Sequence, residues 1–272
     1  MTEPTTFEVG VSFGPTGFWQ DVVQGARLAE ELGLDAVGFW DHYHSGNPDW
    51  ALTCGWAAYG YLAAITERVR LVPMVLCRPN YLTGVLAKES SILQIASNGR
   101  FELGIGAGDF PGEFTAWNVP YASAEERMAL LAETVQVLRE VWKGQLVNFK
   151  GDHLQLTEAA CTPAPPVPPR VVVGAGNSRR LIDQAVSYAD EINVYGDQET
   201  VAYAQQKIAG TGREIALSVF GHRPEGQLPG DLAGEIRQWR ELGVSRYFMT
   251  VGFADNAAEA VARIADAKHA TG

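Results

Sequence analysis

The chain has 272 residues, of which 46% are hydrophobic and 19% are charged, and it contains no low-complexity stretch. This composition supports a large buried core and excludes a disordered or fibrous protein. The formal charge of −11 argues against nucleic acids and anionic membrane surfaces as partners, because both attract a basic face.

Nothing in the N-terminal segment MTEPTTFEVGVSF resembles the basic start and apolar block of a secretion signal. The least polar long window, residues 50–65, is shorter than the roughly 20 apolar residues of a membrane span, so we interpret it as a buried helix. Cys54, Cys77 and Cys161 are spaced too widely for a disulfide framework or a zinc cluster. We therefore expect a soluble, cytoplasmic protein with no membrane partner.

Short β-rich runs alternate with helical patterns along the whole chain. In the first half, the patterns predict strands at 7–14, 35–41, 69–75 and 101–107, with helices at 18–32, 50–66, 81–97 and 124–142. In the second half, they predict strands at 170–174, 191–195, 214–220 and 245–251, with helices at 177–188, 198–209, 231–242 and 255–269. Strands that are apolar on both faces and separated by helices are typical of a parallel sheet covered by helices. Eight such units predict an α/β protein with a (β/α)₈ TIM barrel; an open doubly wound sheet is the alternative.

A meandering segment, 143–169, separates the two halves and ends in the proline-rich run CTPAPPVPPR at 161–170. We interpret this run as a stiff, extended return into the fifth strand, and not as a domain linker. Neither half would close a barrel alone. We therefore expect one domain over residues 1–272, with short insertions.

The second predicted strand ends in Asp41 and His42. Active sites of (β/α)₈ barrels form at the carboxyl ends of the strands. A histidine there can move a proton near neutral pH, because its unperturbed pKa is about 6.5. We expect Asp41 to orient the imidazole or to stabilise its charged form; the alternative is a capping Asp beside a structural His.

His42 and His44 form an H-x-H pattern, which in a barrel raises the possibility of a metal hydrolase. Such a site needs further ligands on later strands. The fifth strand ends in Gly174 and Ala175 and supplies none, so we expect no metal.

The fourth strand and the loop after it read RFELGIGAGDFPGEF at 100–114. Gly104, Gly106 and Gly108 clear one face and leave room for a neighbour to lie against the backbone. Asp109 and Glu113 then stand at the rim. The alternative is tight interior packing with solvated loop acids.

The fifth strand runs into Gly174, Ala175 and Gly176, and a helix is expected to open at Asn177 and Ser178. Unpaired amides at a helix N-terminus, with no side chain to block approach, form a seat for a phosphate. The alternative is an ordinary Gly-Asn capped turn.

The third strand ends in Pro73, Met74 and Val75, which are apolar where a site should be polar. They are either core or a backbone platform behind an aromatic ring. A flat ring, a phosphate tail and a proton-transfer group together indicate a flavin-like cofactor. Trp40, Trp50 and Trp117 either wall the pocket or pack elsewhere.

Three segments, 29–42, 66–108 and 169–194, resemble the bacterial luciferase-like superfamily of flavin monooxygenases and deazaflavin oxidoreductases. The sequence is most similar to its coenzyme F420-dependent branch, which includes methylenetetrahydromethanopterin reductase. The resemblance implies a (β/α)₈ barrel, often a homodimer, that passes a hydride between C5 of F420 and a small organic substrate. An FMN-dependent monooxygenase using O₂ and a non-catalytic flavin-binding protein are the alternatives.

By the same resemblance, Asp41 and His42 lie at the deazaflavin, Asp109 is the acid after the strand-four glycines, and Glu113 lies one helical turn further on. A non-prolyl cis peptide is implied at Pro73–Met74 or at the next bond. The implied catalytic residues are Asp41, His42, Asp109 and Glu113, and the implied cofactor-binding residues are Asp41, Pro73, Met74, Val75, Gly106, Ala107, Gly108, Gly174, Ala175, Gly176, Asn177 and Ser178.

Three positions depart from the family pattern. Asp109 is shorter than the Glu of the sugar-phosphate branch, Gly112 replaces a polar side chain, and Pro73 replaces a small polar residue. Lys or Arg positions that would clamp a sugar phosphate are not evident near the rim, so that substrate is not expected here.

Overall fold

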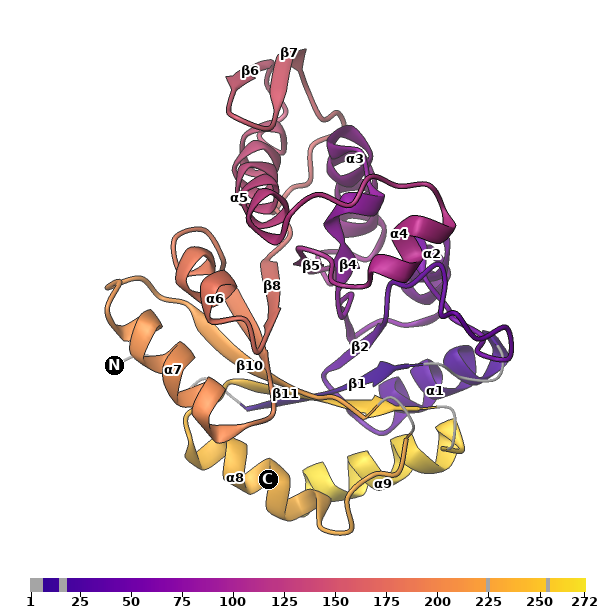
Figure 1. The fold of residues 1–272 in the computed structure, drawn as a ribbon. Helices are drawn as coiled ribbons and strands as arrows, with labels where there is room; N and C mark the ends of the chain where they lie inside the picture. Colours follow the sequence, from indigo (N-terminus) through magenta and orange to yellow (C-terminus); the bar gives the residue numbers. More distant parts are fainter. Residues whose placement is uncertain (1–6, 15–18, 224–225, 253–254) are drawn as a thin grey trace.

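The computed structural model describes residues 7–14, 19–223, 226–252 and 255–272 (Figure 1). Its strands are β1 (Glu8–Phe13), β2 (Ala36–Phe39), β3 (Arg70–Leu71), β4 (Leu76–Cys77), β5 (Leu103–Gly106), β6 (Val147–Lys150), β7 (Gln155–Ala159), β8 (Val171–Gly176), β9 (Glu191–Tyr195), β10 (Ala216–Gly221) and β11 (Arg246–Val251). Its helices are α1 (Trp19–Glu31), α2 (Gly55–Ile65), the 3-10 turn η1 (Arg78–Asn80), α3 (Thr83–Ala96), α4 (Pro111–Ala116), α5 (Ala124–Val141), α6 (Arg179–Ala185), α7 (Gln198–Ala209), α8 (Leu232–Glu241) and α9 (Ala257–His269).

The main sheet is a closed barrel. Its nine strands follow the order β3-β2-β1-β11-β10-β9-β8-β5-β4, and the paired strands are parallel. β3 pairs with β2 and β4 pairs with β5, so these two short strands share the third of eight positions. A parallel bridge between Leu71 and Phe101 joins that position to its neighbour. The predicted α/β barrel is therefore confirmed, and the open sheet is excluded.

The third position is where the strand prediction was too simple. We expected one strand over 69–75, but the chain pairs only at β3 and again at β4. Residues 72–75 bulge between them, and the bond in the cis form is Met74–Val75. The first of the two expected bonds, Pro73–Met74, was therefore wrong, and the second was right.

Glycines on the neighbouring strands make room for this bulge. A Cβ on Gly104 would lie 1.8 Å from the carbonyl oxygen of Pro73, and one on Gly38 would lie 2.1 Å from that of Val72. No side chain fits at such distances, because they are far inside van der Waals contact. The neighbour that lies against the bare backbone of β5 is thus the chain's own third strand.

The side chain of Val75 occupies the next gap. A Cβ on either Gly106 or Gly174 would come within 2.8 Å of Val75 Cγ2. Gly108 lies beyond the end of β5 and has a φ of +81°, a region that L side chains rarely adopt. The three glycines therefore serve two purposes: two of them accommodate the bulge, and the third turns the chain out of the barrel.

Five helices from α5 onward begin where polar residues cap them. The side chain of the residue before each helix accepts a hydrogen bond from a backbone amide in its first turn, and these caps are Ser123, Ser178, Asp197, Asp231 and Asn256. α2 and α3 have no such side-chain cap. Accordingly, α2 begins at Gly55, five residues after the start predicted from its apolar pattern.

The segment 143–169 carries secondary structure that the sequence reading missed. β6 and β7 form an antiparallel hairpin that extends from the barrel beyond the end of α5 (Figure 1). Glu133 of α5 accepts hydrogen bonds from the backbone amides of Asp152, His153 and Leu154, which fixes the hairpin turn to the helix. Among the described residues, no helix is both long and apolar enough to cross a bilayer.

The amino-terminal end of the barrel is closed by a buried ion cluster. Arg246 Nη2 lies 2.6 Å from a carboxylate oxygen of Glu102 and 2.6 Å from one of Glu191. Buried charges are tolerated only when they are paired in this way. This cluster fills the barrel interior at the end opposite the expected site.

Candidate functional site

The carboxyl ends of the strands surround a cavity of about 690 Å³. Its lining brings together fourteen of the fifteen residues that the sequence nominated: Asp41, His42, Met74, Val75, Gly106, Ala107, Gly108, Asp109, Glu113, Gly174, Ala175, Gly176, Asn177 and Ser178. Pro73 is the exception, because its carbonyl group fills the gap at Gly104 instead. The placement of the 104–108 and 174–177 segments at one mouth follows from the direct pairing of β5 with β8.

The cavity contains a titratable pair that the sequence did not predict. Nδ1 of His42 lies 2.9 Å from Oε2 of Glu113, and Asn80 Nδ2 donates a hydrogen bond of 2.7 Å to the other oxygen of Glu113. Glu113 is 2% exposed, although it sits on the short helix α4. His42, Glu113 and Asn80 thus form a chain of contacts that runs from the cavity into η1.

The charges around His42 favour its protonated form. Burial lowers the pKa of His42, but the hydrogen bond from its ring to Glu113, and then the charges of Glu113, Asp109 and Asp41, outweigh burial and raise the pKa overall. Burial raises the pKa of Glu113, yet the hydrogen bonds from His42 and Asn80 lower it overall. The pair is therefore biased toward an imidazolium next to a carboxylate.

The hydrogen bonds of Asp41 go to residues other than His42, so the expected orienting role was wrong, whereas its charge contributes to the raised pKa of His42 as expected. Its Oδ2 accepts a hydrogen bond of 3.0 Å from the amide of Cys77, and both of its oxygens lie 2.8 Å from the hydroxyl of Tyr81. The carboxyl is 3% exposed, and burial raises its pKa to about 6 despite these two donors. Asp41 therefore ties the end of β2 to β4 and η1, next to the bulge.

Because Nδ1 is occupied by Glu113, proton exchange between His42 and a ligand falls to Nε2. The side chain of His42 is 33% exposed, which leaves it open to the cavity. Asp109 is exposed at the same rim, where its charge contributes to the raised pKa of His42. The arrangement can deliver a proton to, or accept one from, a substrate oxygen.

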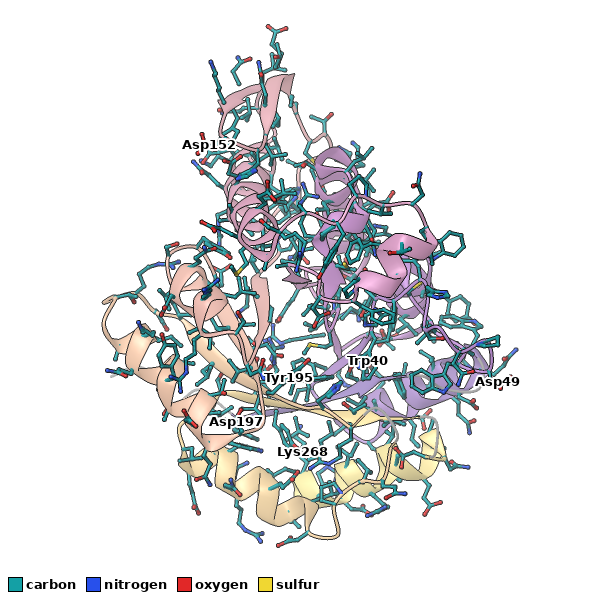
Figure 2. The ribbon with its side chains drawn as sticks, in the orientation of Figure 1. Trp40, Asp49, Asp152, Tyr195, Asp197 and Lys268 are labelled. Atoms are coloured by element: carbon teal, nitrogen blue, oxygen red, sulfur yellow. The ribbon has the colours of Figure 1, made fainter. Side chains whose placement is uncertain are left out.

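An aromatic row, formed by Trp40, His222 and Tyr195, also lines the cavity. His222 stacks on Trp40 at a centroid distance of 5.3 Å and on Tyr195 at 5.1 Å, with interplanar angles of 20° and 23°. These residues end β2, β10 and β9, and Figure 2 labels Trp40 and Tyr195 toward the middle of the barrel. Their position at strand ends could have identified them from the sequence, but His222 and Tyr195 had been given no role.

The other two tryptophans considered from the sequence, Trp50 and Trp117, lie in different places. Trp50 lines the cavity. Trp117 is 61% exposed, its Nε1 donates a hydrogen bond to the backbone oxygen of Tyr43, and it is not part of the lining.

The turn after β8 presents backbone to the cavity. Gly176 has a φ of +55°, and the amide of Ser178 donates to the oxygen of Ala175. Ser178 Oγ accepts from the amide of Leu181, so its hydroxyl hydrogen remains available to an anion. Any phosphate seat therefore relies on the backbone near Gly176 and Asn177 and on this hydroxyl.

These features fit a planar cofactor with an anionic side arm. The cavity is large enough for such a ring, Met74 and Val75 of the bulge line it, and the 174–178 turn lies at the same mouth. Among the described residues, no group of three or more His, Cys, Asp and Glu side chains is arranged to hold a metal ion.

Comparisons with known proteins agree with this geometry. The family model described as luciferase-like monooxygenase matches residues 5–225. An F420-dependent glucose-6-phosphate dehydrogenase of Amycolatopsis mediterranei is 35% identical over 170 residues, covering 60% of this chain and 49% of the relative. One of the same name from Kineococcus radiotolerans is 34% identical over 157 residues, covering 56% and 45%. The chain spans about half the length of the curated relatives it matches.

Solved structures establish the fold. An F420-dependent secondary alcohol dehydrogenase, in complex with an F420-acetone adduct, superposes with a TM-score of 0.82 at 16% identity, covering 98% of this chain and 99% of the other. The coenzyme F420-dependent tetrahydromethanopterin reductase of Methanopyrus kandleri gives 0.77 at 14% identity, with 96% and 97% covered. The monooxygenase RslO1 of Streptomyces bottropensis gives 0.78 at 18% identity, with 95% and 98% covered.

Proposed function

The chain belongs to the luciferase-like monooxygenase family, and from that premise we propose that it is an F420-dependent oxidoreductase acting on a small organic substrate. The observation that carries the proposal is the pairing of His42 with the buried Glu113 in the cavity that also holds the bulge and the 174–178 turn. The curated relatives named F420-dependent support the choice of cofactor.

Bound F420 would supply a carbon, C5, that accepts or releases a hydride. The protein's own part is positional and electrostatic. The backbone of Met74 and Val75 would support the ring, and Gly176 with its neighbours would hold the phosphate of the side arm. Ala107 and Gly108 line the same cavity.

His42 moves the accompanying proton. When a carbonyl compound is reduced, Nε2 of His42 donates a proton to the oxygen; when an alcohol is oxidised, the same atom accepts it. Glu113 stabilises the imidazolium, Asn80 fixes Glu113, and Asp109 adds negative charge at the rim. Asp41 is a positioning residue in this account, because its oxygens hold Cys77 and Tyr81.

The experiment is a titration of the purified protein with F420 and, separately, with FMN. We expect F420 to bind at least about tenfold more tightly, which corresponds to about 1.4 kcal/mol. FMN binding with no F420 binding would instead support the rival function, an FMN-dependent monooxygenase that uses reduced flavin and O₂. F420 that binds and cycles between redox states without transfer to any substrate would support a non-catalytic flavin-binding protein.

A homodimer and a cytoplasmic location complete the proposal, together with a single domain over residues 1–272. α2 carries no charged residue, and it packs beside α3. The two helices and the residue before α3 share an exposed apolar surface, here called the α2–α3 face, made of Ala57, Gly60, Tyr61, Ala64, Leu82, Val85, Ile92 and Ile95. Leu82 is 77% exposed, and exposed large apolar side chains in a group are typical of protein interfaces. The three free cysteines agree with a reducing compartment.

A further inference from the structure

We propose that the part of this cavity beside His42 selects uncharged carbonyl or hydroxyl compounds and excludes anionic substrates, and that the aromatic row of Trp40, His222 and Tyr195 is its specificity wall. The inference rests on the proposed function for the reaction, and it adds the class of substrate. Three independent features carry it: the cations, the acids and the row itself.

The first feature is the position of the cations. The sequence contains 21 Lys and Arg residues, all of them in the described part, and only Arg127 lines the cavity. Its Nε donates to the backbone oxygen of Gly108 at 3.0 Å, and Nη1 donates to that of Ala122. Its guanidinium also lies over the ring of Tyr121, 4.1 Å from the centroid. Arg127 is therefore held by the protein and is 8% exposed, so it offers little to a substrate anion.

Another arginine lies behind the row without serving the cavity. Arg223 follows His222 directly, yet its Nη2 pairs with Glu235 at 2.7 Å and its Nη1 lies 3.4 Å from the hydroxyl of Tyr247. These groups line a separate cavity of about 320 Å³. Arg223 is thus paired with Glu235 in this second cavity.

The second feature is the excess of acids. Asp41, Asp109 and Glu113 line the cavity, and Glu113 already holds the ring of His42; the other basic groups in the lining are Arg127, His44 and His222. A carboxylate or phosphate placed beside these acids would lose its hydration and meet charges of its own sign. Anionic substrates are disfavoured for that reason.

The third feature is the chemistry of the row. Trp40 also meets His42 edge to face at 6.1 Å, so the row begins beside the proton-transfer group. Burial lowers the pKa of His222, which keeps its ring neutral at neutral pH. A substrate whose oxygen reaches His42 therefore extends along aromatic edges, which favour apolar rings and chains.

Reduction of a ketone is the reaction to be measured. The carbonyl carbon accepts a hydride from reduced F420, the π electron pair moves to the oxygen, and that oxygen takes the proton of His42 Nε2. The ketone is reduced to an alcohol, and the deazaflavin is oxidised.

The test compares two ligands that differ by one carboxylate group: cyclohexanone and 4-oxocyclohexanecarboxylate. Their dissociation constants for the cofactor-free protein are measured by ligand-observed NMR. We expect cyclohexanone to bind at least about tenfold more tightly, since the carboxylate loses hydration without a partner. Equal or tighter binding of the carboxylate overturns the proposal, and so does failure of both ligands to bind.

A charge reversal on the wall sharpens the test. His222→Arg places a permanent cation in the row and should raise the affinity for the carboxylate about tenfold, with little change for cyclohexanone. The matched control is Ser187→Arg, which adds the same charge at an exposed position beyond the carboxyl end of α6. A gain of equal size in both variants shows a general charge effect and overturns the role of the row. The wild-type comparison stands by itself if His222→Arg does not fold.

The two proposals fail in different ways. Absence of F420 binding ends the proposed function but leaves the ligand comparison intact, because that comparison uses cofactor-free protein. With F420 bound, kcat/KM for the two ketones provides a second readout, and it should differ in the same direction as the affinities.

Discussion

Oε2 of Glu113 lies 2.9 Å from Nδ1 of His42, although 71 residues separate them in the chain. The contact joins the end of β2 to the helix after β5, across the third barrel position. Asn80, from that third position, holds the second oxygen of Glu113. Three consecutive βα units therefore each contribute one member of the proton-transfer group.

Glu113→Gln tests this group directly. The substitution keeps the shape of the side chain and removes the charge that raises the pKa of His42. We expect the pKa of His42 to fall, so that the decline in ketone reduction on the alkaline side shifts to lower pH. Turnover should drop by about 10²-fold, a typical contribution of general acid catalysis. NMR titration of the His42 ring and a pH–rate profile measure the two effects.

Glu241→Gln, at the exposed end of α8, is the control and should change neither the pKa of His42 nor turnover. A pKa of His42 that stays fixed in Glu113→Gln contradicts the assignment.

Asp41→Asn should alter the pH dependence of stability. The pKa of Asp41 is raised from 3.8 to about 6, mainly by burial, so its contribution to stability is complete below pH 3.8 and is lost as the pH rises through about 6. The neutral amide does not titrate. Relative to wild type, the variant should therefore gain about 2 kcal/mol in unfolding free energy between pH 4 and pH 7.5. Urea unfolding at the two pH values measures the difference, and an equal effect of the substitution at both would refute the raised pKa.

Gly104→Ala should be strongly destabilising, because the added Cβ would lie 1.8 Å from the Pro73 oxygen. Relief requires movement of the bulge, and we expect a loss of about 3 kcal/mol or more, in the range of severe overpacking. Gly84→Ala is the matched control on α3, where a Cβ meets nothing within 4 Å. Because Gly84 is only the second residue of α3, the substitution should be neutral or stabilise the protein by up to about 1 kcal/mol. Equal effects of the two variants in urea unfolding would contradict the account of the glycines.

The sequence predicted the barrel well because alternating apolar runs and capping residues are local signals. Ser178, Asp197 and Asn256 each mark the start of a helix that the chain indeed forms. The split third strand could not be read in this way. Its cause is steric and long-range: Gly38, on a different strand, has no side chain and so leaves room for the backbone of Val72.

The sequence predicted which residues line the cavity but not which of them contact one another. Strand ends converge in a barrel, so the residues there could be collected from the sequence alone. Which acid holds His42 depends on the direction of the six-residue helix α4, and its short length gives no periodic signal. The stacking of His222 between Trp40 and Tyr195 likewise depends on side-chain positions from three separate strands.

Ile92→Glu tests the expected homodimer. The residue is 42% exposed on the α2–α3 face, and a buried, unpaired charge at an interface would weaken self-association. Sedimentation velocity should show a dimer for wild type and a shift toward monomer for the variant. Leu146→Glu is the control, since Leu146 is 68% exposed but lies before the β6–β7 hairpin. A monomeric wild type, or equal dissociation of both variants, would count against this face as the interface.

We propose that one mouth of the barrel holds both the ring and the anionic side arm of F420. Hydrogen–deuterium exchange with and without F420 measures this placement. We expect slower exchange of backbone amides in two segments, 106–109 and 174–178, with little change in the β6–β7 hairpin. Unchanged exchange in both segments at saturating F420, or protection confined to another part of the chain, would contradict it.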